Sequence, residues 1–530
     1  MTISHLSFPA QFPAVLPPVV VVVSSSPLRS TVISASFAMQ GRSTPAMCSH
    51  PLLDRLLTHL RSLSVPRLLL TILFSHLLIT RLLLRRLLPF IAQRLINRSV
   101  LTITNATITD PQKDRLVMCM KGHVENAGPL PAKIEFLGPV KLCVEDDRSF
   151  GAGKRRVVVE DGRRLVIIGE ADGMPPITTS SGSADIDARV SVRILDTQAF
   201  AAFAKTMMES TKFSLTLLAT NLKVVAFNLP IYSTKLLKTV TLKGLQNLNQ
   251  IQILKAVTTG GTSTHITLTT TCEIYNPSDI TLSVGTVTLA LYHEDIYQVG
   301  TVEMNNLTLQ PGTNRITATA AYSPQTTPAT QSGRKLLASY VTNTPATVTI
   351  RGTPTSTPIS YLRPALQSLS VTTILPPESR KMIQKTQLVI DPFRLTTRLQ
   401  SATKLVLFNP MLAPVTILWM KGTVTCRGEV VGNLDEDLQS RNEMVVLAPE
   451  TSVQTGIMGM RLRIAPGALG AILTAAVAEG RGDGRKETAD QDGGIKLFEV
   501  DVESTIGCRV GQYEVVIDYR QEGVPVGLGG

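Results

Sequence analysis

The sequence predicts a mainly β protein. Three tandem antiparallel β-sandwich modules, each with a helix, are expected to follow a disordered N-terminal arm and one apolar helix. Three observations predict this fold class. Short runs of Val, Ile, Thr and Leu alternate with polar residues through most of the chain, which is typical of strands with one buried face. A domain-sized pattern occurs three times, and the leucine-rich helical run is confined to the first 100 residues.

The N-terminal arm is predicted to be disordered over residues 1–50, because it is rich in Ser and Pro. Its one apolar stretch, residues 12–23, is too short and too rich in proline to cross a bilayer. Residues 51–66 repeat leucine at helical spacing, which predicts an interfacial amphipathic helix.

Residues 67–90 are the candidate transmembrane helix. A helix over residues 68–90 would measure roughly 35 Å, enough for a hydrocarbon core of about 30 Å. Its Leu, Ile and Phe residues favour insertion by roughly 7 kcal/mol in sum, against about 2.5–3.5 kcal/mol for an Arg at the bilayer centre. Arg81, Arg85 and Arg86 therefore make insertion marginal. The alternative is a basic helix on an anionic membrane surface, because Arg67, Arg81 and Arg85 share one helical face.

The internal repeat consists of a strand that ends in Asn, an apolar return strand, and a Gly 23 to 25 residues after the Asn. A period of this size indicates one whole domain per repeat. Turn geometry alone accounts for the repeated Asn, Pro and Gly, so no site residue is assigned to them. The three pairs are Asn126 and Gly151, Asn276 and Gly300, and Asn409 and Gly432.

The three modules are predicted at residues 91–233, 234–375 and 376–530. Each carries one expected helix: a run capped by Asp196, then residues 361–369, then residues 467–480. Residues 323–335 are predicted to form a loop inside the second module, and residues 374–379 a linker into the third.

Charge and cysteine content exclude several classes of protein. Ten Arg and a single acid in residues 1–100 supply +9 of the net charge of +12, so most of the basic charge lies in the first 100 residues. With only 5% aromatic residues, the chain also lacks the stacking surface of a typical nucleic-acid binder. No CxxC pair occurs, which excludes zinc-ribbon and thioredoxin-type sites. Cys119 and Cys143 are interpreted as buried thiols, with a disulfide between neighbouring strands as the alternative.

A search for chemistry finds no catalytic, cofactor-binding or metal-ligating residues, and the protein is predicted not to be an enzyme. His293, Glu294 and Asp295 are the densest titratable cluster, but they fall between two strands, where a solvated turn is expected. Residues 145–147 are likewise expected to form a solvated turn. Residues 481–483 spell an integrin-type tripeptide, taken as a chance match in a loop. Trp419, the only tryptophan, is expected in the core or on a sheet face, with a lipid contact as the alternative.

Four segments carry a resemblance to two known families. Residues 89–111 follow the apolar run and resemble the start of a fungal membrane-protein family of unknown function. Residues 243–251, 272–292 and 309–316 are similar to the late-embryogenesis-abundant group-two domain, also called the water-stress and hypersensitive-response domain. The resemblance implies β-sandwich modules beyond one membrane helix, an endomembrane site such as the vacuole with the modules in the lumen, and lipid binding or transfer.

We therefore expect a non-enzymatic, membrane-anchored array of β-sandwiches that binds lipid or a protein partner at a vacuolar or other endomembrane lumen. Three glycosylation sequons, at Asn97, Asn105 and Asn306, are compatible with a lumenal location. The alternative is a soluble or peripheral stress-protective binding protein. Neither reading implies a cofactor or a nucleic-acid partner, and the sequence does not identify the ligand.

Overall fold

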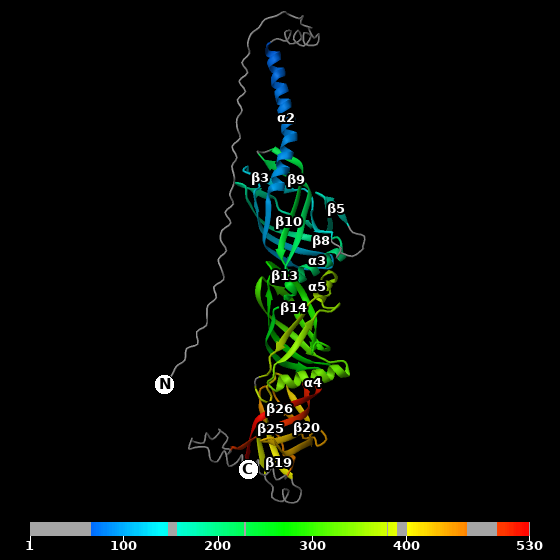
Figure 1. Ribbon diagram of the computed structural model, residues 1–530, viewed down its shortest axis with the longest axis vertical. Coiled ribbons are helices and arrows are strands. Elements are labelled where there is room, and N and C mark those ends of the chain that lie inside the picture. Colours follow the sequence, from blue (N-terminus) through cyan, green and yellow to red (C-terminus); the bar gives the residue numbers. More distant parts are fainter. Residues whose placement is uncertain are drawn as a thin grey trace, which may run out of the picture. The chain divides into compact units, whose positions relative to one another are not determined.

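The computed structural model describes residues 65–146, 156–226, 229–378, 380–389, 400–463 and 496–528 (Figure 1). Strands dominate the described residues, so the mainly β prediction is confirmed. The predicted disordered arm, most of the helix predicted at 51–66, the helix predicted at 467–480 and the tripeptide at 481–483 lie outside the described residues.

Helix α2 (Val65–Arg98) covers the predicted apolar segment. The chain divides into two units, Met1–Ile79 and Thr80–Gly530, so the first unit contains the N-terminal part of this helix. The large apolar side chains described there, Leu70, Ile72, Leu73, Phe74, Leu77 and Leu78, are all more than half exposed. The transmembrane helix predicted for residues 67–90 is not found, because no helix of the described residues combines the length and the apolar character that a membrane span requires.

The strands of the second unit form three consecutive groups. Strand group 1 contains β1 (Val100–Thr109), β2 (Arg115–Glu125), β3 (Ala132–Phe136), β4 (Val140–Glu145), β5 (Val157–Glu160), β6 (Arg163–Asp172), β7 (Ile177–Thr179), β8 (Ala184–Ile194), β9 (Lys212–Ala226) and β10 (Leu229–Lys243). Strand group 2 contains β11 (Ile251–Gly261), β12 (Ile266–Asn276), β13 (Ile280–His293), β14 (Tyr297–Leu309), β15 (Gly312–Tyr322), β16 (Ala346–Arg351) and β17 (Ser370–Leu375). Strand group 3 contains β18 (Ile383–Val389), β19 (Gln400–Phe408), β20 (Val415–Cys426), β21 (Glu429–Asp437), β22 (Val445–Leu447), β23 (Ser452–Gln454), β24 (Met458–Leu462), β25 (Lys496–Val510) and β26 (Tyr513–Leu528).

One pairing order recurs in all three groups. In group 2 it runs β11–β12–β15–β14–β13–β16–β17. The same order appears in group 1 as β1–β2–β8–β6–β4–β9–β10. It appears in group 3 as β18–β19–β24–β21–β20–β25–β26. Each repeated Asn stands at the end of the second strand in this order, or directly after it, so the sequence repeat has a topological counterpart.

Two pairings depart from the purely antiparallel arrangement that the sequence predicts. Strand β18 pairs in parallel with β26, so the strands of group 3 close into a hydrogen-bonded ring. Strand β1 pairs in parallel with β13, which joins groups 1 and 2 into one hydrogen-bonded network. The number of separate sandwiches therefore stays a prediction. Strand β10 also runs across the boundary predicted at 233/234 and pairs with β9 up to Lys243.

In each of the first two groups a helix connects the third strand of the pairing order to the sixth: α3 (Thr197–Glu209) lies between β8 and β9, and α4 (Thr327–Val341) lies between β15 and β16. Helix α3 is capped by Asp196, as predicted: the carboxylate accepts a hydrogen bond from the Ala199 N–H at 2.9 Å. Helix α4 is its counterpart in group 2. The prediction of a loop over residues 323–335 is therefore wrong. The Thr326 cap, Pro328 in the first turn and a buried face that includes Leu336 and Leu337 account for the helix.

Residues 361–369, predicted as the helix of the second module, form a 3-10 turn followed by a short α-helix. They contribute to η3 (Ser360–Leu362) and α5 (Arg363–Gln367). This segment packs against α3 of group 1, where the rings of Tyr361 and Phe200 meet edge to face at 5.1 Å. A further single turn, η2 (Gln246–Leu248), precedes β11.

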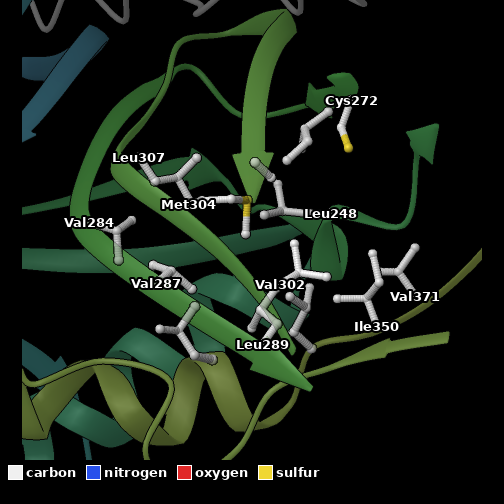
Figure 2. Packing of buried hydrophobic residues seen from close by; sticks show 14 of the residues in the cluster. Leu248, Cys272, Val284, Val287, Leu289, Val302, Met304, Leu307, Ile350 and Val371 are labelled. Carbon is white, nitrogen blue, oxygen red and sulfur yellow. The ribbon is translucent and has the colours of Figure 1, made fainter. Parts of the chain in front are cut away.

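Apolar side chains fill the interior of each group because alternate strand residues point inward. Strand β8 shows strict alternation of buried and exposed positions from Ala184 to Ile194. Figure 2 shows the corresponding cluster in group 2, in which Val287, Leu289 and Val302 meet Leu248 and Ile350. The buried faces of the strands therefore form an interior in every group.

Candidate ligand-binding cavity

The interior of strand group 1 contains a cavity of about 110 Å³. The C-terminal part of α2 forms one wall, and strands β1, β3, β9 and β10 contribute to the others. Among the lining side chains are Ala92, Ile96, Ile134, Leu217, Val224 and Ile231. Nearly all of the lining is aliphatic, so the cavity suits an apolar ligand.

Helical periodicity brings α2 to this cavity. Leu88, Ala92, Leu95 and Ile96 recur at spacings of three and four residues and therefore share one helical face. The loop after β2 closes over this face at Gly128, where φ is +102° and an added Cβ would lie 2.9 Å from Leu95. The positive φ favours glycine at this position, and the absence of a side chain leaves room for Leu95.

Hydrogen bonds connect the C-terminal end of α2 to strand β10. The Gln93 amide oxygen accepts a hydrogen bond from the Lys235 backbone N–H, and its amide nitrogen donates to the Lys235 carbonyl, both at 2.8 Å. Lys238 donates to the carbonyl oxygens of Asn97, at 3.1 Å, and Ser99. A lysine suits this place because the carbonyls at a helix C-terminus lack intrahelical partners and carry partial negative charge.

Lys238 is the one ionisable residue among those that line the cavity. Burial lowers the pKa of its ammonium group, since removal from water disfavours the charged form. The other prominent polar group is already paired: the Thr179 hydroxyl donates to the Ala132 carbonyl and accepts from the Ala132 N–H. The cavity therefore combines aliphatic walls with one cation.

The other two groups hold smaller cavities. The cavity of group 2 measures about 50 Å³ and includes Leu268, Tyr322 and Ile350 in its walls. The cavity of group 3 measures about 60 Å³ and includes Leu405, Val431 and Phe498. All three cavities lie between strands of the same pairing order, so an interior apolar space is a property of the repeat.

Glu294 and Asp295 form the turn that the sequence predicts and both have positive φ between β13 and β14, whereas His293 is the last residue of β13. The two carboxylates form ion pairs, Glu294 with Lys335 at 3.2 Å and Asp295 with Arg351 at 2.6 Å. His293 is buried, and its Nδ1 lies 2.7 Å from the Ser332 hydroxyl of α4. These contacts thus connect the turn between β13 and β14 to helix α4 and strand β16.

Burial of His293 makes stability depend on pH. Desolvation lowers the pKa of its imidazole in the folded protein below the ordinary value of 6.5, although Glu294 partly opposes the shift. The unfolded chain therefore takes up a proton first as the pH falls. The stabilising contribution is complete above pH 6.5 and is lost as the pH falls through the folded-state pKa.

Urea unfolding at pH 7.5, 6.5 and 5.5 should show a smaller loss of stability for His293→Gln than for the wild type, because glutamine does not titrate. Equal losses would contradict this account.

The other residues that the sequence singled out lie apart from the cavity of group 1. Trp419 on β20 is half-buried and packs on Gly507 of β25, where an added Cβ would lie 2.1 Å from the indole nitrogen. Cys119 and Cys143 are both free thiols, but only Cys143 is buried as predicted, and Cys119 is half-buried. Burial raises the pKa of Cys143 to about 11. The described residues contain no group of three or more His, Cys, Asp or Glu that could hold a metal ion.

The sequence reasoning did not identify Lys238 or the cavity. Lys238 follows Asn97 by 141 residues, so their contact depends on how β10 lies against α2. The only local signal was the spacing of Leu88, Ala92 and Leu95, which was interpreted as part of a membrane segment and its flank.

Comparison with known proteins gives one family match. Residues 173–291 match the model of a family described as "Protein of unknown function (DUF3712)", which covers 119 of the 530 residues. The match runs from before β7 into β13 and therefore crosses from group 1 into group 2. No curated protein matches the chain. Neither the fungal membrane-protein family nor the late-embryogenesis-abundant domain is named by these findings, so both resemblances stay predictions.

Three solved structures show remote similarity to the chain. A protein from Corynebacterium diphtheriae, described as "Putative membrane anchored protein", is 9% identical; the match covers 80% of this chain and 91% of that chain, with a TM-score of 0.15. A protein of unknown function from Porphyromonas gingivalis is 11% identical, with 52% and 99% covered and a TM-score of 0.12. Escherichia coli alpha-2-macroglobulin activated by porcine elastase is 9% identical, with 79% and 31% covered and a TM-score of 0.13. At these TM-scores the similarities carry no argument about fold or function.

Proposed function

We propose that the protein is a non-enzymatic, membrane-associated array of β modules that binds the apolar chain of an anionic lipid in the cavity of strand group 1. The cavity itself carries this proposal. An engineered protein cavity of about 150 Å³ with aliphatic and aromatic walls stays dry and binds benzene. The cavity of group 1, about 110 Å³, can therefore hold a few methylene groups, namely those next to the head group of an acyl chain.

Lys238 supports an anionic head group. An ammonium group has three N–H donors, and two of them are directed at the carbonyls of Asn97 and Ser99. The third remains for a carboxylate or phosphate oxygen. An anion beside Lys238 would also favour the charged ammonium, which burial disfavours.

The exposed apolar side chains of α2 support membrane association. Leu70, Phe74 and Leu78 recur at four-residue spacing, and each is more than half exposed. Arg81 follows them and is exposed as well. A helix with exposed leucines and basic residues binds at the interface of a membrane with anionic lipids. The predicted vacuolar or other endomembrane lumen is kept as part of the proposal, and the exposure of the sequon residues Asn97, Asn105 and Asn306 supports it.

Sedimentation with sucrose-loaded anionic vesicles that contain a fluorescent fatty acid tests both the proposed membrane association and the proposed lipid binding. The delipidated full-length protein should sediment partly with the vesicles, and its soluble fraction should carry the label. Val224→Phe places a ring in the cavity and should lower the extracted label at least tenfold. The matched change Val159→Phe on β5, where the valine is 65% exposed, should leave extraction unchanged.

The same assay tests separately whether Lys238 binds an anionic head group. Lys238→Met should weaken extraction of the fatty acid more than extraction of its methyl ester, because only the acid offers a carboxylate. The ratio of acid to ester is informative even if the variant loosens α2. No extraction by the wild type, or equal extraction by wild type and Val224→Phe, would overturn the proposed lipid site.

A further inference from the structure

The cavity of strand group 3 differs from the others in its polar groups. Three hydroxyls, those of Thr386, Thr403 and Ser504, belong to residues that line it. These residues are 7%, 3% and 5% exposed, and none of the three hydroxyls has a hydrogen-bond partner among the described residues. A buried hydroxyl without a partner costs about 1–3 kcal/mol, so three at one cavity indicate that a polar group belongs there.

The corresponding cavities show that this is not a general property of the repeat. In group 1 the Thr179 hydroxyl bonds to the Ala132 backbone. In group 2 the Thr270 hydroxyl donates to the Ala318 carbonyl at 3.1 Å. Both threonines line their cavities and are satisfied by the neighbouring strand. Among these three cavities, only that of group 3 is therefore lined by hydroxyls without a partner among the described residues.

Strand register brings the hydroxyls into the closed ring of group 3. Thr386 on β18 stands opposite Leu405 on β19, and Thr403 stands opposite Leu388. The two threonines therefore lie diagonally on one face of neighbouring strands. Ser504 comes from β25 and stands opposite Gly422 of β20, which also lines the cavity. An added Cβ at Gly422 would lie 2.7 Å from the Ser504 Cβ, so the glycine leaves room beside that serine.

A cleft lies against the strands that form one wall of this cavity. It measures about 660 Å³ and shares the wall residues Gly422, Leu434 and Ser504 with the cavity. Its volume falls within the usual range of small-molecule sites, roughly 300–1,000 Å³. Lys421 and Asp435, which form an ion pair at 3.3 Å, also line it. The cleft is thus polar, whereas the cavity behind it is apolar apart from its hydroxyls.

We propose that the group 3 cavity binds the hydroxyl end of a neutral aliphatic alcohol. A hydroxyl both donates and accepts, so it can pair with threonine and serine hydroxyls in either direction. The aliphatic walls accommodate the neighbouring methylene groups. No charged residue lines the cavity, so a carboxylate or an ammonium group would lose its hydration without gaining a counter-charge. The ligand therefore differs in head-group chemistry from the anionic lipid proposed for group 1.

Calorimetric titration of the full-length protein with hexan-1-ol tests the inference, with hexanoate and hexylamine as charged analogues of equal chain length. The cavity of group 1 is proposed to take an anion with an apolar chain, so the three ligands are compared in the full-length Val224→Phe protein, in which a ring fills that cavity. There we expect binding of the alcohol alone. Replacing both threonines, Thr386→Val and Thr403→Val, should weaken alcohol binding at least tenfold. Thr416→Val on β20, outside the cavity, is the matched control and should bind as the wild type does. Val224→Phe should also bind alcohol normally, which separates this site from that of group 1.

Thermal unfolding without alcohol supplies the second readout. Valine has nearly the shape of threonine, so removing hydroxyls that lack partners should leave the unfolding temperature unchanged or raise it. Absence of alcohol binding, together with a lower unfolding temperature for the double variant, would overturn the proposal and show that water alone pairs with these hydroxyls.

Discussion

Replacing Asn409 with alanine should lower the free energy of unfolding of strand group 3 by about 4 kcal/mol. The Asn409 side chain is 1% exposed, and its amide nitrogen lies 2.8 Å from the Ala413 carbonyl and 3.2 Å from those of Leu447 and Ala448. Its amide oxygen accepts a hydrogen bond from the Met411 N–H at 3.0 Å. Alanine would leave these backbone groups without their partner in the interior.

The fluorescence of Trp419 provides the measurement, because the only tryptophan of the chain lies in group 3. Urea unfolding followed through this residue should show a lower midpoint for Asn409→Ala. Asn433→Ala on β21 is the control, since the Asn433 side chain makes no hydrogen bond within the described residues; it should cost less than about 1 kcal/mol. A similar midpoint shift for both variants would show that the buried hydrogen bonds of Asn409 contribute no more to stability than the side chain of Asn433 does.

The repeat extends this argument to the other groups, with one exception. Asn276 is also 1% exposed, and its amide nitrogen donates to the Ile280 carbonyl at 2.8 Å. Its amide oxygen accepts from the Ser278 N–H and hydroxyl. Asn126, in contrast, is exposed and has a φ of 58°. Asn276 therefore holds its turn together as Asn409 does, whereas Asn126 serves its turn through backbone conformation.

The second large effect is expected for Gly300→Ala, at about 3 kcal/mol. Gly300 lies on β14 opposite Tyr322 of β15. A Cβ added there would lie 2.1 Å from the Ala321 carbonyl oxygen and 3.1 Å from the Tyr322 Cα. Both are backbone atoms, so relief requires the two strands to move apart, which weakens their hydrogen bonds.

Amide hydrogen exchange across β14 and β15 measures this effect locally. Protection should fall in both strands of the Gly300→Ala variant. The repeat-related change Gly432→Ala is the control, because its Cβ would meet the Met460 side chain, with Sδ at 2.9 Å. A methionine can change its side-chain torsions, so we expect a loss of about 1 kcal/mol there. Unchanged protection of β14 and β15 in Gly300→Ala would contradict the predicted strand separation.

The sequence could predict what depends on local pattern. Alternating β-branched residues predict the strands, and the Asp196 cap predicts α3. Helix α4 was missed because its first turns contain Thr, Pro, Ser, Gln and Gly, which favour loops when considered alone. Its buried face is set by packing against β14 and β26, which no local pattern reports.

The cavities and their polar groups depend on register between distant strands. The pairing of Thr386 with Leu405 fixes where its hydroxyl points, and a shift of one residue would turn it outward. Lys238 likewise depends on the placement of β10 beside the end of α2. Threonine and lysine are both common in β-rich sequences, so composition gives no signal for the cavity of group 3 or for that of group 1.

The parallel pairing of β18 with β26 has a consequence for association between molecules. An edge strand presents unpaired N–H and C=O groups, which can pair with another chain. In group 3 the principal strands have neighbours on both sides, since the first and last strands of its pairing order bond to each other. Group 3 therefore offers few strand edges for aggregation or domain swapping.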